Sequence, residues 1–307
     1  MSTLKKTLFV VTCQHDKWKF EMMCRSISAF LEPCRIVIVH NESDKKYKEW
    51  LEWFNTNINE TLLYKFSVVT YPSSHFWPKD IPQHLDYELE LGGWVGQQML
   101  KILGHSVIKT EEYVILDSKN FFFRPYNIDN TPSCNAHGNW TLRGVTEWTK
   151  LSCQRLGLTY PGYHLKLRPN VTPYIFKTHV AKRLVKYFGG NLSFYCWFAE
   201  TALLPEISPA EFILYDLFEL RLGQRSTDPD EPITYSTIWR HQLLQEKQTP
   251  RQIAHTIIKE YNDGLKPCPI SGFHSGVEPL LTLTDVKDIL KILDVDFIMP
   301  TNSLGPF

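Results

Sequence analysis

The 307-residue sequence lacks an excess of charge of either sign, because 33 lysines and arginines balance 33 aspartates and glutamates. Proteins dedicated to binding nucleic acid usually carry a basic excess, so this balance argues against nucleic acid as a partner. It leaves room for a local basic pocket that binds a diphosphate. Hydrophobic residues make up 43% of the chain, which is enough to bury a large core and argues against disorder.

The seven cysteines include no pair at a CxxC spacing, and their number is odd. This usage argues against a disulfide framework or a zinc knot and favours reduced thiols in a cytosol. Long apolar runs are also missing, since none approaches the roughly 18 residues of a membrane-spanning helix. The run at residues 8–11 ends at Thr12, which is too short for a signal peptide. We therefore expect a cytoplasmic protein with no transmembrane segment.

What the first half of the chain does contain is an alternation of short apolar runs with amphipathic segments. The runs predict strands at residues 7–13, 35–39, 62–71 and 113–116, and the amphipathic spacing predicts helices at residues 16–31, 44–54 and 93–108. Strands that alternate with helices are typical of parallel β-α-β units. The predicted fold is α/β, with helices on both faces of one mostly parallel, Rossmann-like sheet.

The second half of the chain is less regular. Helices are expected at residues 146–156, 178–188, 209–220 and 284–293, and Thr284 is the predicted cap of the last one. The composition of residues 226–231 is that of a surface loop. The sequence shows no internal repeat and no low-complexity tract. These features predict a single domain over residues 1–307.

Polar residues follow three of the predicted strands, at residues 12–14, 40–43 and 117–120. Ligands of such sheets bind beyond the carboxyl ends of the strands, so we expect these residues along one edge. Asp117 comes directly after an apolar strand, where a carboxylate is suited to hold a hard divalent cation against a diphosphate. The alternative is a loop aspartate that only caps the following turn.

Residues 113–125 read YVILDSKNFFFRP and resemble the Asp-x-Asp stretch of GT-A-type glycosyltransferases. They look most like the DUF6492 glycosyltransferase-like family, in which a helix reading GW…QQ…K precedes this strand. Here residues 93–101 read GWVGQQMLK, at the expected distance. Looser matches at residues 170–176 and 208–215 extend the resemblance from about residue 7 to about residue 215. It implies a GT-A-like fold.

The resemblance also implies a function. A glycosyltransferase of this kind moves a sugar from a nucleotide-diphosphate-sugar donor to a glycan or other hydroxyl acceptor, for example in polysaccharide biosynthesis. Residues 1–125 would then form the nucleotide-sugar-binding half and residues 126–307 the acceptor-binding half. The expected donor-binding residues are Thr12, Gln14, Asn41, Gln98, Lys101, Ser118 and Lys119.

Gln98 and Lys101 belong to the GW…QQ…K helix. They lie one helical turn apart, so both face the same direction. The resemblance directs that face toward the donor. The alternative is a polar face exposed to solvent.

One position departs from the family pattern. An Asp-x-Asp motif offers two carboxylates, but here Lys119 takes the second place and the motif reads Asp-Ser-Lys. An ammonium cannot bind Mg²⁺ or Mn²⁺, although it can pair with a diphosphate. Three interpretations follow. Asp117 binds a divalent metal (Mn²⁺ or Mg²⁺) together with His274, or the enzyme is independent of metal, or the protein binds its ligands without turnover.

His274 is considered because GT-A enzymes as a group often complete the metal site with a histidine near the C-terminus. It lies in the short glycine-flanked stretch Gly272–Gly276, which is suited to fold over a donor. The alternative is an ordinary loop histidine.

Glu211 is the candidate general base, and Asp117 and Glu211 are the two predicted catalytic residues. Glu211 stands in an otherwise apolar segment, where partial burial raises the pKa of a carboxyl toward a useful range. The alternative is a carboxylate in the first turn of a helix, where the helix dipole favours it.

Two other classes of function compete with transfer. A glycan- or nucleotide-sugar-binding protein without turnover is motivated by the missing second acid. A nucleotidyltransferase is disfavoured, because Gln14-His15-Asp16 follows the first strand where a glycine-rich phosphate loop would be expected.

Overall fold

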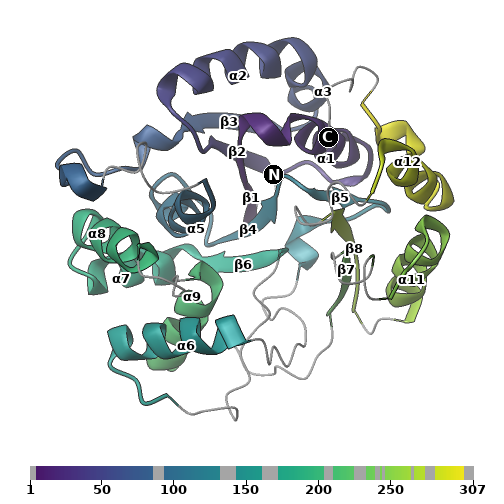
Figure 1. Ribbon diagram of the computed structural model, residues 1–307. Helices are drawn as coiled ribbons and strands as arrows, with labels where there is room; N and C mark the ends of the chain where they lie inside the picture. Colours follow the sequence, from purple (N-terminus) through teal and green to yellow (C-terminus); the bar gives the residue numbers. More distant parts are fainter. Residues whose placement is uncertain are drawn as a thin grey trace.

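The computed structural model describes residues 5–85, 93–131, 143–160, 172–203, 210–224, 233–238, 243, 246–263, 266–273 and 281–300. Its centre is a five-stranded sheet in the order β3-β2-β1-β4-β6 (Figure 1). The first four strands are parallel, and β6 pairs antiparallel with β4. The strands are β1 (Lys6–Thr12), β2 (Arg35–His40), β3 (Ser67–Pro72), β4 (Glu112–Asp117) and β6 (Tyr174–Lys177). The predicted α/β fold with a mostly parallel sheet is confirmed.

Helices cover both faces of this sheet because its central strands are apolar on both sides. Leu8 and Val10 of β1 pack against α1 and α2, whereas Phe9 and Val11 point to the opposite core, which includes α5. The helices on the first face are α1 (Lys17–Phe30), α2 (Asp44–Asn57) and α3 (Asn59–Leu63). Those on the second side are α5 (Gly93–Leu103), α6 (Arg143–Leu156), α7 (Thr178–Tyr187), α8 (Asn191–Ala202) and α9 (Glu211–Arg221).

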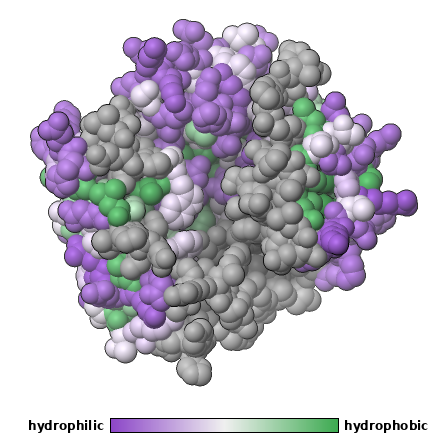
Figure 2. Space-filling view, viewed as in Figure 1, coloured by the Kyte–Doolittle hydropathy of each residue, from purple (hydrophilic) through white to green (hydrophobic). Residues whose placement is uncertain are grey.

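Helix α2 illustrates how such a helix divides between core and solvent. Of its 14 residues only Trp50 and Phe54 are buried, one turn apart on the face that meets the sheet. The remaining face is rich in lysine and glutamate, and Figure 2 shows hydrophilic residues gathered over this region at the top of the view.

A second sheet of three strands adjoins the first, in the order β5-β8-β7. It consists of β5 (Asn120–Phe122), β7 (Ile233–Ile238) and β8 (Lys266–Phe273), and the helices α11 (Pro250–Asp263) and α12 (Leu283–Ile292) lie beside it (Figure 1). A third apolar cluster joins these two helices to β5 and β8. Only Ser118 and Lys119 separate β4 from β5, so this turn lies where the chain passes from one sheet to the other.

Several predicted elements differ from the structure. The strand expected from residue 62 begins at Ser67, because residues 59–63 form α3. The helix expected over 93–108 ends at Leu103 and continues as a 3-10 turn, and Thr282 rather than Thr284 caps α12. Thr282 is the cap because Asp285 lies three residues later. The Thr282 side chain accepts from the Asp285 backbone N–H, and the Asp285 side chain accepts from the Thr282 backbone N–H, which together form a capping box. The predicted loop at residues 226–231 lies outside the described residues.

Short 3-10 turns complete the described structure: η1 (Gln14–Asp16), η2 (Ser73–His75), η3 (Gln83–Leu85), η4 (Gly104–Ser106), η5 (Ile128–Asn130) and η8 (Asp296–Ile298). Within the part of the chain that the structure describes, no helix has the length and apolar character needed to cross a lipid bilayer.

Candidate active site at the carboxyl edge of the sheet

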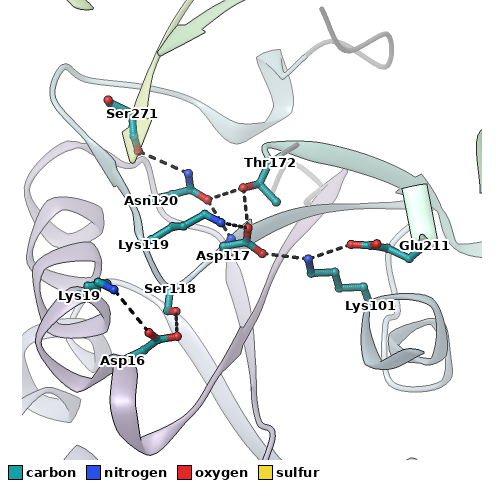
Figure 3. Close-up of polar contacts among 10 residues, drawn as sticks. All are labelled: Asp16, Lys19, Lys101, Asp117, Ser118, Lys119, Asn120, Thr172, Glu211 and Ser271. Atoms are coloured by element: carbon teal, nitrogen blue, oxygen red, sulfur yellow. Dashed lines mark hydrogen bonds and ion pairs between the residues drawn. The ribbon is translucent and has the colours of Figure 1, made fainter. Parts of the chain in front are cut away.

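Asp117 is the last residue of β4 and stands at the carboxyl edge of the central sheet. Two lysines share its carboxylate (Figure 3). The ammonium of Lys101 lies 2.9 Å from Oδ1, and that of Lys119 lies 3.0 Å from Oδ2. Asp117 is therefore the centre of a charged group rather than an isolated carboxylate.

Lys101 extends this group toward helix α9. Its Nζ also lies 2.9 Å from Oε1 of Glu211, the first residue of α9, and 4.9 Å from the centre of the Phe212 ring. Gln98, one turn before Lys101 on α5, places its side-chain amide against the same Glu211 carboxylate. Gln98 and Lys101 thus lie on one face of α5, and that face is buried.

Burial and pairing together set the charge of the cluster. Burial works to lower the pKa of Lys101, but Asp117 and Glu211 outweigh it, so the pKa lies above its ordinary value. Burial works to raise the pKa of Asp117, but Lys101 and Lys119 hold it well below its ordinary value. For Glu211 burial prevails over the attraction of Lys101, and its pKa is raised. Asp117 is consequently a stable carboxylate at neutral pH.

The turn that carries Ser118 and Lys119 is held by side-chain hydrogen bonds. The backbone N–H of Asp117 donates to Oδ1 of Asn120 at 2.9 Å, and the hydroxyl of Thr172 donates to the same oxygen at 2.7 Å. Thr172 Oγ1 also lies 3.3 Å from Oδ2 of Asp117. β8 passes so closely that a Cβ on Gly272 would stand 3.0 Å from the Lys119 carbonyl oxygen. These contacts fix the backbone beneath Lys119.

Ser118 joins the turn to the segment after β1. Its hydroxyl donates to Oδ2 of Asp16 at 2.6 Å, and Lys19 lies 4.0 Å from the other oxygen of Asp16 (Figure 3). Asp16 was not among the predicted site residues, nor were Asn120 and Thr172. Asn120 does belong to the polar stretch 117–120 that follows a predicted strand, whereas Asp16 begins the helix predicted over residues 16–31.

Thr12, Gln14 and Asn41 lie along the neighbouring edge, after β1 and β2. The backbone N–H of Asn41 donates to the Thr12 carbonyl at 2.8 Å, and its side-chain amide donates to the Gly93 carbonyl at the start of α5, at 2.5 Å. Oγ1 of Thr12, Oε1 of Gln14 and Oδ1 of Asn41 are buried without a hydrogen-bond partner among the described residues. Because buried polar atoms are normally paired, these three oxygens are suited to accept hydrogen bonds from a ligand.

A second ionisable group lies at the end of β2. His40 is fully buried, and its Nε2 stands 3.3 Å from Oε2 of Glu42. The backbone N–H of Gln14 donates to the same oxygen, and Lys46 pairs with Oε1 of Glu42. Burial lowers the pKa of His40 to about 4, although Glu42 opposes this shift. His40 is therefore neutral at neutral pH. Its ring packs against that of Trp50, and the two ring centres lie 5.1 Å apart.

The described residues do not fit a divalent cation at Asp117. Both oxygens of that carboxylate are already paired with ammonium groups, which repel a cation. The described part of the chain also brings no three His, Cys, Asp or Glu side chains together in an arrangement that holds a metal. His274, the other predicted ligand, lies outside the described residues.

The structure thus brings most predicted site residues together. One group surrounds Asp117: Gln98, Lys101, Ser118, Lys119 and Glu211. The other, Thr12, Gln14 and Asn41, lies on the adjoining strand ends. Residues 7–261 of the chain match the model of a family of unknown function, DUF6492. The chain belongs to this family. The resemblance carried by residues 93–125 is confirmed.

The fold of this DUF6492 protein is similar to that of a solved glycosyltransferase. The apo form of mouse xyloside xylosyltransferase 1 is similar over 89% of this chain and 98% of that chain, with a TM-score of 0.50 and 11% identity. The galactosyltransferase LgtC, solved with donor and acceptor sugar analogs, is similar over 98% of this chain and 97% of its own, with a TM-score of 0.46 and 10% identity. No curated protein matches the sequence. At 11% identity the likeness to the xylosyltransferase concerns the fold alone, which is GT-A-like as predicted.

Proposed function

We propose that this DUF6492 protein is a glycosyltransferase that moves a sugar from a nucleotide-diphosphate-sugar donor to a glycan or other hydroxyl acceptor. The observation that carries the proposal is the ionised Asp117 at the carboxyl edge of a GT-A-like sheet, with Lys119 paired to it. Ligands of open α/β sheets bind at this edge. The proposed setting is polysaccharide biosynthesis in the cytoplasm, without a nucleic-acid partner.

The donor is proposed to lie along the strand ends. The nucleoside would donate hydrogen bonds to the unpartnered oxygens of Thr12, Gln14 and Asn41. The diphosphate would then lie toward the turn of Ser118 and Lys119. Catalysis would come from holding the reacting groups in place and from stabilising charge on the leaving diphosphate.

Glu211 remains our proposed general base. Its raised pKa suits that role, because a base works best when its pKa lies near the working pH. Its side chain is 1% exposed and paired with Lys101, so the proposal requires that substrate binding bring an acceptor hydroxyl to this carboxylate. The acceptor would be bound mainly by residues 126–307.

The proposal is tested by measuring donor binding. We expect at least one of a panel of UDP- and GDP-sugars to raise the melting temperature of the wild-type protein in a ligand-dependent manner. Asp117→Asn should abolish that shift. Asp263→Asn is the matched control, because Asp263 is an exposed carboxylate that pairs with Lys259 on α11. Full retention of donor binding and turnover in Asp117→Asn would refute the assignment.

A second candidate function is ligand binding without turnover, and the observation that favours it is Lys119 in place of the second acid. The two functions differ in the fate of the donor. Incubation with UDP- and GDP-sugars, with and without Mn²⁺, releases a nucleoside diphosphate only if the protein is an enzyme. A binding protein shows thermal stabilisation alone.

A further inference from the structure

We propose that Lys119 supplies the positive charge that a divalent cation supplies at an Asp-x-Asp site, so that the donor diphosphate is held by an ammonium group without metal. This inference deepens the proposed function and rests on it. It decides among the three interpretations of the Asp-Ser-Lys motif in favour of an enzyme that is independent of metal.

The charge balance is the first argument. The second aspartate of an Asp-x-Asp motif carries one negative charge, and the divalent cation that it binds carries two positive charges. Together they add one positive charge beside the first aspartate. Lys119 adds the same single positive charge at the same sequence position, so the charge that faces the diphosphate is unchanged.

The second argument is that the two lysines on Asp117 differ in their freedom. Lys101 is 3% exposed and is held on its other side by Glu211, so it stays in the cluster. Lys119 is 21% exposed, and among the described residues it forms an ion pair with Asp117 alone. Lys119 is therefore the ammonium that can turn to an incoming diphosphate.

The third argument is that Asp117 tolerates the departure of Lys119. A buried carboxylate that loses its only cation is strongly disfavoured. Here Oδ1 keeps the ammonium of Lys101, and the hydroxyl of Thr172 remains 3.3 Å from Oδ2. Lys101 thus keeps a positive charge beside Asp117 when Lys119 turns away, which leaves Lys119 available to the donor.

The backbone of Lys119 is fixed while its side chain is long. Its carbonyl oxygen accepts from the Phe273 N–H at 3.3 Å, and the glycine beside it leaves no room for a side chain. The four-carbon stem still lets the ammonium rotate about a stationary Cα. A diphosphate offers more negative charge than one carboxylate, so the ammonium gains by turning from Asp117 to the donor.

The test measures the affinity for UDP and for GDP by calorimetry, once in EDTA and once in Mn²⁺. The wild-type protein should bind its preferred nucleotide equally well in both. Lys119→Met should bind about 10- to 100-fold more weakly in both, the loss expected for one charge-assisted hydrogen bond. Lys119→Arg should retain binding in EDTA, because it keeps the charge.

Lys119→Asp is the decisive variant, because it restores the two acids of an Asp-x-Asp motif. It should bind weakly in EDTA and regain affinity in Mn²⁺. Lys259→Met, which removes an exposed lysine from α11, is the matched control and should bind as the wild type does. Melting temperatures of the free variants report whether each one folds.

Three outcomes would overturn the inference: wild-type binding that requires Mn²⁺, undiminished binding by Lys119→Met in EDTA, or Lys119→Asp that ignores Mn²⁺. None of these contradicts the proposed function, since a nucleotide is still bound by the wild-type protein. The absence of wild-type binding to any nucleotide, with or without Mn²⁺, would contradict both.

Discussion

The ammonium of Lys101 lies midway in a chain of ion pairs, 2.9 Å from Asp117 on one side and 2.9 Å from Glu211 on the other. Lys101 and Asp117 belong to the neighbouring elements α5 and β4, whereas Glu211 begins α9, 110 positions after Lys101. One buried ammonium therefore joins the end of a central strand to the start of a helix in the second half of the chain.

Removal of that ammonium should destabilise the fold. Lys101→Met leaves Asp117 with Lys119 alone and removes the ammonium from the buried Glu211, and an uncompensated buried charge costs about 3–5 kcal/mol. Urea denaturation of the variant measures this loss. The double variant Lys101→Met with Glu211→Gln should recover part of it, because one of the two carboxylates is then neutral. A loss below about 1 kcal/mol, as for an exposed pair, would show that the cluster contributes little.

Glu211→Gln tests the proposed base. If Glu211 accepts the acceptor proton, kcat should fall by roughly 10²- to 10⁴-fold while nucleotide affinity is unchanged. The kcat of the wild type should rise as the pH increases through the raised pKa of Glu211, and this rise should vanish in the variant. Glu219→Gln on the same helix is the control, since Glu219 is equally buried but pairs with Lys177. A kcat for Glu211→Gln equal to that of the control would rule out the role.

Thr12→Val separates donor binding from stability. The Thr12 hydroxyl is buried without a partner among the described residues, so its replacement by a methyl group of similar shape should not lower the free energy of unfolding. If the donor uses this hydroxyl, nucleotide affinity should fall by about 3- to 10-fold, the value of one neutral hydrogen bond. Calorimetry measures the nucleotide affinity, and urea denaturation of the same preparations measures the free energy of unfolding. Unchanged affinity would place the nucleoside elsewhere.

His40 should make the stability depend on pH. The pKa of an unfolded histidine is about 6.5, and burial lowers that of His40 to about 4. Between these values the unfolded chain binds more protons than the folded protein, so stability rises with pH in this window. As the pH falls from 6.5 to 4, protonation of His40 should lower the free energy of unfolding by up to roughly 3 kcal/mol.

The variant His40→Phe isolates this contribution. The raised pKa of Glu211 makes stability fall as the pH rises, which opposes the effect of His40. Because Glu211 is present in both proteins, its contribution cancels in the comparison. Urea denaturation at pH 7 and at pH 4.5 should give a smaller loss of stability for His40→Phe than for the wild type. Parallel pH profiles for the two proteins would contradict the low pKa of His40.

Strands β1, β2 and β4 of the central sheet were predictable because they are largely buried and so read as continuous apolar runs. Strand β6 was not predicted, because it has only four residues. Strand β8 was not, because it contains Pro267, Pro269 and Gly272, which depress strand propensity. Its place is decided by pairing with β5 and β7, which the local sequence does not reveal. The start of β3 was misplaced because Leu62 is apolar in α3 just as it would be in a strand.

Some residues of the candidate site were likewise predictable from the sequence, and others were not. Asp117, Thr12 and Asn41 were found because their strands end there, and strand ends are visible in the sequence. The burial of Lys101 was not, since a lysine on a helix is ordinarily exposed and only the approach of Glu211 makes a buried position stable. Asp16 reaches Ser118 across 102 positions of the chain, and no local pattern reports such a contact.

The most direct test of the central claim is the release of nucleoside diphosphate from a panel of UDP- and GDP-sugars, supplied with oligosaccharide acceptors. We predict release from at least one donor, and Asp117→Asn should lower its rate by roughly 100-fold or more. Asp263→Asn should leave the rate unchanged. Release from no donor, by a folded protein that still binds nucleotide, would contradict transferase activity and identify a binding protein instead.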